Sequence, residues 1–81
     1  MSRAEVTEQL NGIFRDVFDD DSITVSDETT AADIEDWDSL THITLISEVE
    51  EAFECKFTMK AVLELKNVGE MIDYILEETE S

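Results

Sequence analysis

The sequence predicts an all-α fold: a small four-helix bundle of three main helices plus one short helix, with a long loop between helices 1 and 2. Apolar residues recur at helical spacing in three segments, and this periodicity is the main signal for helix. The chain has two glycines and no proline, which disfavours hairpins and tight β-turns. Because 81 residues can build only one modest core, we expect residues 1–81 to form a single domain.

Helix 1 is predicted from Ser2 to Phe18. Ser2 and Glu5 have the spacing of a capping box, in which each side chain satisfies a backbone N–H of the other residue. The apolar residues that follow share one face of the helix: Val6, Leu10, Ile13, Phe14, Val17 and Phe18. Such a stripe is typical of a helix packed on a core.

A long polar stretch runs from Asp19 to Asp38. Loops longer than about 12–15 residues without structure of their own are uncommon in compact domains and are usually functional. We expect this loop to be held by its few apolar residues and to form a short helical turn from Ala31 to Ile34. Trp37 near its end could anchor the loop to the core or stack on a ligand, and anchoring is the commoner role.

Helix 2 is predicted from Ser39 to Phe53, with Asp38 as its N-cap. The expected core face comprises Leu45, Ile46, Val49, Ala52 and Phe53. Leu40, Ile43 and Ser47 lie to the side of that face, beside acidic residues. An exposed apolar strip bordered by acids suits docking to a partner protein.

The last two helices are predicted from Met59 to about Leu65 and from Asn67 to about Glu78. Thr58 precedes the first of them, and Asn67 and Glu70 have cap spacing in the second. The apolar stripe of the final helix comprises Val68, Met71, Ile72, Ile75 and Leu76.

The charge is strongly acidic, with 22 acidic and 5 basic residues and a formal net charge of −17. Nucleic acid and anionic membrane surfaces are therefore disfavoured as partners, because both require cationic side chains. Basic protein surfaces are favoured, since opposite charge steers the encounter. The same charge repels itself within the fold, so we expect marginal stability at low ionic strength that improves with salt or Mg²⁺.

The location predicted from the sequence is cytoplasmic. A single cysteine, Cys55, excludes an internal disulfide, which fits a reducing compartment. No apolar run approaches the roughly 20 residues of a membrane span, and the N-terminal residues lack the apolar stretch of a signal peptide.

Ser39 is the residue that most suggests a function. A serine in the first turn of a helix is common and often has no role beyond the turn itself. The alternative is a point of covalent attachment, because the N-terminus of a helix favours negative charge and would accommodate a phosphodiester.

The sequence around Ser39 resembles that of the acyl carrier proteins and related carrier domains. Asp38-Ser39-Leu40 at the start of a helix is similar to the family's Asp-Ser-Leu motif, and a preceding tryptophan such as Trp37 is common in it. Two later segments are similar to the family's second and last helices: Glu48–Phe53, and Val68 with Met71–Ile75. The resemblance covers essentially the whole chain.

This resemblance implies a carrier protein that is not an enzyme and has no catalytic residues or metal. A phosphopantetheinyl transferase would attach 4′-phosphopantetheine from coenzyme A to Ser39, with Asp38 and Leu40 beside the attachment site. Acyl intermediates would be held on the arm as thioesters and shuttled between enzymes of fatty acid, polyketide or related lipid biosynthesis. These enzymes would present basic patches to a monomeric carrier. The expected docking residues are Leu40, Ile43, Ser47, Glu48, Glu50 and Glu51.

The chain departs from the best-known fatty-acid carriers after its motif. Their corresponding positions are richer in acid, whereas Thr41-His42-Ile43-Thr44 follows here. A specialised role therefore remains open, including an aminoacyl carrier such as a D-alanyl or peptidyl carrier protein. An acidic helical adaptor that needs no modification is the alternative of another class.

Catalytic and metal-binding interpretations have less support. A Ser39–His42 pair lacks a nucleophile elbow and a third orienting group, so we expect His42 to be a partly exposed residue that tunes docking. Cys55 has no second cysteine for a metal or redox site and is expected to be a bystander. The acidic stretches 19–21 and 33–38 do not follow the calcium-loop pattern of alternate acids with a central glycine.

Overall fold

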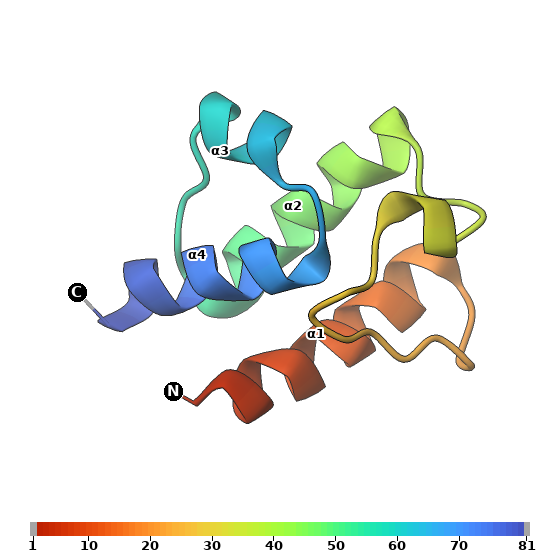
Figure 1. The fold of residues 1–81 in the computed structure, drawn as a ribbon, viewed down its shortest axis with the longest axis horizontal. Coiled ribbons are helices and arrows are strands. Elements are labelled where there is room, and N and C mark those ends of the chain that lie inside the picture. The colour runs from red at the N-terminus through yellow and green to blue at the C-terminus, as the bar shows by residue number, and fades with distance from the viewer. Residues whose placement is uncertain (1, 81) are drawn as a thin grey trace.

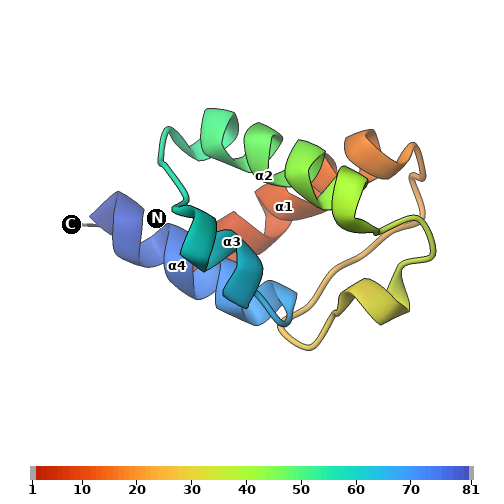
Figure 2. The same cartoon turned by 90° about the horizontal axis from the view of Figure 1, so that it is seen from above.

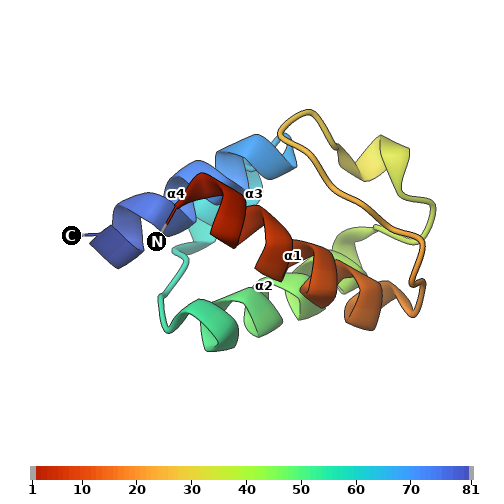
Figure 3. The same cartoon turned by 90° about the horizontal axis from the view of Figure 1, so that it is seen from below.

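The computed structural model describes residues 2–80, with the side chain of Glu80 left out, and confirms the all-α prediction. Its elements in chain order are α1 (Arg3–Phe18), the 3₁₀ turn η1 (Ala31–Asp33), α2 (Ser39–Phe53), α3 (Met59–Glu64) and α4 (Val68–Glu80). No strand occurs among the described residues. In all three views, α1 begins and α4 ends at one end of the molecule, and the loop between α1 and α2 lies at the other (Figures 1, 2 and 3).

The core is formed mainly by α1, α2 and α4, with α1 packed against both of the others. Fully buried apolar side chains come from all three helices: Val6, Leu10, Phe14, Leu45, Val49, Val68, Met71, Ile72 and Ile75. The predicted capping box is present at the start of α1, where Ser2 Oγ accepts from the N–H of Glu5 and the Glu5 carboxylate accepts from the N–H of Ser2. The inward face of α1 is the one that carries its predicted apolar residues, among which Val6, Leu10, Phe14 and Phe18 are buried.

The core face of α2 differs from the prediction at one position. Leu45, Ile46, Val49 and Phe53 are buried, as expected, but Ala52 is exposed. Ala52 and Ile46 lie at opposite edges of the predicted arc, and the helix turns its Ile46 edge into the core. Periodicity locates an apolar arc, but the neighbouring helices decide where its edges fall.

The first part of the long loop is held by hydrogen bonds between its backbone and two side chains of α1. On α1, Asn11 Oδ1 accepts from the N–H of Val25 at 2.7 Å, and Arg15 Nε donates to the carbonyl of Ile23 at 2.7 Å. Val25 is buried. The loop therefore lies along α1 as a fixed part of the fold, as its apolar residues predict.

The same loop also contacts the start of α4. The N–H of Val68 donates to the carbonyl of Thr29 at 2.8 Å, and the N–H of Gly69 donates to the carbonyl of Asp27 at 3.0 Å. These bonds satisfy two N–H groups in the first turn of α4, which have no partner within the helix. Their geometry ties the loop to the last helix.

The caps of α3 and α4 agree with the sequence. Thr58 Oγ1 accepts from the N–H of Ala61 at the start of α3. At the start of α4, Asn67 Oδ1 accepts from the N–H of Glu70, and the Glu70 carboxylate accepts from the N–H of Lys66. No helix within residues 2–80 is both long enough and apolar enough to cross a bilayer.

Candidate functional site

Ser39 is the first residue of α2, directly after the N-cap, and its side chain is exposed. Its hydroxyl makes no hydrogen bond to any described side chain or backbone group. A reagent can therefore approach the hydroxyl without breaking an internal contact. This is the position that the sequence predicts for an attachment point.

Asp38 forms the predicted N-cap in front of Ser39. Its Oδ1 accepts from the N–H groups of Leu40 and Thr41, each at 3.0 Å. In return, the N–H of Asp38 donates to the Thr41 hydroxyl at 2.8 Å, and that hydroxyl donates to the carbonyl of Asp36. The backbone on both sides of Ser39 is thus fixed by one reciprocal network.

The cap changes one part of the sequence-based argument. The N–H groups of Leu40 and Thr41, which we expected to favour an anionic group on Ser39, are already bound by the Asp38 carboxylate. A phosphodiester on Ser39 would therefore not be held by these two donors. The cap fixes the backbone on which Ser39 is exposed.

Replacing Asp38 by alanine should lower the melting temperature of the protein by several degrees at neutral pH, because the N-cap is lost. The hydrogen bond from the N–H of Thr41, followed by those from its hydroxyl and the N–H of Leu40, lowers the pKa of Asp38. A carboxylate with a lowered folded pKa stabilises the fold above its ordinary value of about 3.9, and this stabilisation is lost as the pH falls through the folded pKa. Urea unfolding of both proteins should thus show a difference at about pH 7 that shrinks at about pH 3. An undiminished difference at acid pH would contradict this account.

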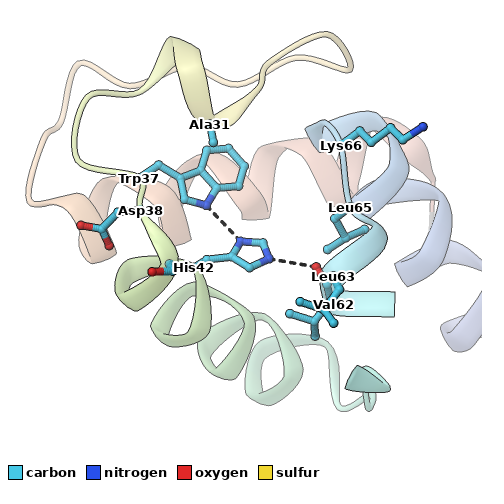
Figure 4. A pocket seen from close by; sticks show the side chains of 9 residues that line it. Ala31, Trp37, Asp38, His42, Val62, Leu63, Leu65 and Lys66 are labelled. Carbon is cyan, nitrogen blue, oxygen red and sulfur yellow. Dashed lines mark hydrogen bonds between the residues drawn. The ribbon is translucent and has the colours of Figure 1, made fainter. Parts of the chain in front are cut away.

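A cavity of about 330 Å³ lies beside Ser39, between the start of α2, the loop and α3. It is lined by Ala31, Trp37, Asp38, Ser39, His42, Val62, Leu63, Leu65 and Lys66. Most of these residues are apolar, and Figure 4 shows the Trp37 indole and the leucines of the α3 segment on opposite sides of the His42 imidazole. Its volume is at the lower end of the range for small-molecule sites, roughly 300–1,000 Å³.

Trp37 anchors the loop to the core, as expected. Its indole meets the Phe14 ring edge-on at a centroid distance of 5.2 Å and also contacts Phe18 at 6.3 Å. Trp37 also lines the cavity, so the same side chain both anchors the loop and forms part of the site.

His42 is partly exposed, as expected, and its ring also makes internal contacts that the sequence does not predict. The side chain is half-buried and forms an internal bridge, with the Trp37 Nε1–H donating to its Nδ1 at 3.0 Å and its Nε2 at 3.2 Å from the carbonyl oxygen of Val62. The position on α2 was evident from the sequence, but neither partner is within one helical turn of His42. No local pattern could have shown this bridge.

The predicted docking residues lie on α2, and most of them are exposed. Leu40 is 80% exposed and Ile43 is 56% exposed, unusually high for large apolar side chains. The others that are exposed are Ser47, Glu48 and Glu51. Glu50 differs, because it is half-buried and its Oε2 accepts from the N–H of Phe57 at 2.7 Å. Glu50 thus has an internal contact that fixes the segment between α2 and α3.

Cys55 is buried, and burial raises the pKa of its thiol, with further contributions from the charges of Glu50 and Glu78. A protonated, enclosed thiol is a poor nucleophile and a poor metal ligand. Within residues 2–80, no group of three or more His, Cys, Asp and Glu side chains is arranged to hold a metal ion.

The fold and the site define a class of protein: a small acidic helical bundle with an exposed serine at a helix start, beside an apolar cavity. A family model described as a phosphopantetheine attachment site matches residues 8–75. The chain belongs to this family of phosphopantetheine-binding carrier domains, and the match supports the predicted cofactor.

One solved structure is similar over most of its length. It is the solution NMR structure of a holo acyl carrier protein from Geobacter metallireducens, which is 43% identical to this chain. The similarity covers 93% of this chain and 86% of that one, with a TM-score of 0.87. A comparison with curated proteins gives no match.

Proposed function

We propose that the protein is an acyl carrier whose 4′-phosphopantetheine arm is attached to Ser39. The observation that supports this most directly is the exposed, unbonded hydroxyl of Ser39 on a backbone fixed by the Asp38 cap. A phosphopantetheinyl transferase needs access to that oxygen, and no internal contact has to break to give it. When bound, the group supplies a flexible arm ending in a thiol that carries the acyl cargo.

The cavity favours an apolar cargo. It opens next to Ser39, and its walls include Trp37, Val62 and Leu65. Apolar walls stabilise a hydrocarbon chain by removing it from water, by about 25 cal/mol per Å² of buried apolar surface. An acyl intermediate of fatty acid, polyketide or related lipid biosynthesis therefore suits this site better than a charged aminoacyl group.

Docking to the enzymes that load and process the cargo would use the outer face of α2. Leu40 and Ile43 supply exposed apolar surface close to Ser39, and Glu48 and Glu51 supply charge farther along the helix. A partner with an apolar patch beside basic residues fits this face. Charge-steered binding of this kind can be fast and weak, as a shuttle between several enzymes requires.

Replacing Ser39 by alanine should abolish attachment completely, because no other side chain can supply the acceptor oxygen at this position. The test is intact mass spectrometry after incubation with coenzyme A, Mg²⁺ and a broad-specificity phosphopantetheinyl transferase. Ser22→Ala is the control, since Ser22 is also an exposed serine but lies in the loop, outside the expected docking residues. We expect a gain of one phosphopantetheine on the unaltered protein and on Ser22→Ala, and none on Ser39→Ala. No gain on the folded unaltered protein would favour the unmodified acidic adaptor instead.

A further inference from the structure

The hydrogen bonds of His42 fix which of its nitrogens carries the proton. The Trp37 Nε1–H can only donate, so His42 Nδ1 must be the acceptor at 3.0 Å. The Val62 carbonyl can only accept, so Nε2 must carry the hydrogen in the 3.2 Å contact. Both contacts are satisfied at once only by the neutral imidazole protonated on Nε2 (Figure 4).

The carbonyl of Val62 is at a position where a helix needs an outside partner. α3 ends at Glu64, and Leu65 already has extended backbone angles. The N–H of Lys66, which would reach the Val62 carbonyl if the helix continued, donates to the Glu70 carboxylate instead. The imidazole of His42 therefore supplies the missing donor for the last turn of α3.

The hydrogen-bonded bridge of Trp37, His42 and Val62 connects two walls of the cavity. Trp37 comes from the loop, His42 from α2 and Val62 from α3, and all three line the cavity beside Ser39. Besides this hydrogen bond, Trp37 is held on its other side by Phe14 and Phe18. The bridge is thus the polar connection between the loop wall and the α3 wall of the cavity.

We propose that His42 is a positioning residue whose neutral imidazole holds the loop and α3 together around the cavity, and that protonation of Nδ1 releases Trp37. The importance of this for a carried acyl group rests on the proposed function, whereas the bridge itself does not. On this proposal, the contact between the loop wall and the α3 wall depends on the charge state of the His42 ring.

Protonation acts on only one of the two contacts. A hydrogen on Nδ1 would face the Trp37 Nε1–H, so two donors would oppose each other where a hydrogen bond had been. The Nε2–H remains a donor, so the contact with Val62 persists and gains a charged donor. Charged groups on the same cavity are Asp38, on the α2 side, and Lys66, after α3. The α1 face against Trp37 contributes the uncharged rings of Phe14 and Phe18.

The tautomer can be measured directly on the unmodified protein. The chain has one histidine and one tryptophan, so each gives a single set of ring signals in a ¹⁵N NMR spectrum. Where the ¹⁵N shifts show a neutral ring, we expect its proton on Nε2 and the indole N–H to be protected from exchange. A neutral ring protonated on Nδ1 would overturn the proposal.

Quenching of Trp37 fluorescence by neutral acrylamide tests the release. We expect the quenching constant to rise by about twofold as acidification converts the His42 ring signals from the neutral to the charged form, with helix content by circular dichroism unchanged. His42→Gln is the matched control, because an amide can accept and donate but takes up no proton here. A constant value in the unaltered protein, or the same rise in His42→Gln, would overturn the proposal. Neither measurement depends on attachment at Ser39, so a failure here is distinct from a failure of the proposed function.

Discussion

Replacing Gly69 by alanine is expected to lower the free energy of unfolding by about 1–3 kcal/mol, because the added methyl group has no space. A Cβ at this position would lie 2.8 Å from the backbone carbonyl oxygen of Asp27 and 3.2 Å from Asn67 Oδ1. The N–H of Gly69 donates to that same carbonyl at 3.0 Å, so the loop cannot move away without losing the bond. The change should therefore weaken the connection between the loop and α4. Urea unfolding followed by circular dichroism measures the effect.

Gly12→Ala is the matched control for this prediction. Gly12 lies in the interior of α1, is exposed, and has no heavy atom within 4 Å of the position of an added Cβ. Alanine there should raise the free energy of unfolding by roughly 0.5–1 kcal/mol, since glycine costs more conformational entropy in a helix. Changes of the same sign in the two variants would show that the close contact at Gly69 does not govern its effect.

The sequence predicts the helices well because their signals are local. The apolar stripes of the three main helices and the caps at Ser2, Asp38, Thr58 and Asn67 depend on residues within one or two turns; the caps are present, and the stripes are buried except at the edges, such as Ala52. The exposed position of Ser39 follows from the same signals, because a cap and an apolar stripe together locate the start of α2.

What the sequence does not predict depends on contacts between distant segments. Asn11 and Arg15 hold the loop through backbone atoms eight or more residues away, and Gly69 must be small because of Asp27, far away in sequence. Neither His42 nor Glu50 differs by spacing from a solvent-exposed helical residue. The hydrogen-bond partners of these polar side chains follow no sequence periodicity. They can be identified only from the packed arrangement of the helices.

Raising the ionic strength from about 10 mM to about 150 mM should stabilise the fold by several kcal/mol, because the chain is strongly self-repelling. The molecule measures 33 × 25 × 21 Å and carries a formal net charge of −17. The Debye length falls over this range from about 30 Å, comparable to the whole molecule, to about 8 Å, which spans only neighbouring groups. A like-charged pair about 15 Å apart repels by roughly 0.3 kcal/mol in water, and the net charge represents roughly a hundred such pairs. In the unfolded chain the charges lie farther apart, so salt lowers its free energy by less than that of the folded protein.

Salt also weakens attractive pairs, so the sign depends on which effect is larger. Arg3 pairs with Asp27 and Asp73, and all three side chains are substantially exposed, so these pairs contribute little to stability. Repulsion among the acidic residues, 22 against 5 basic ones, should therefore dominate. The measurement is the urea midpoint of unfolding at increasing NaCl concentration. Urea is uncharged, so the denaturant itself does not screen the charges. MgCl₂ should give the same stabilisation at a lower concentration. A midpoint that stays constant or falls with added salt would show that the repulsion is already relieved in the folded chain.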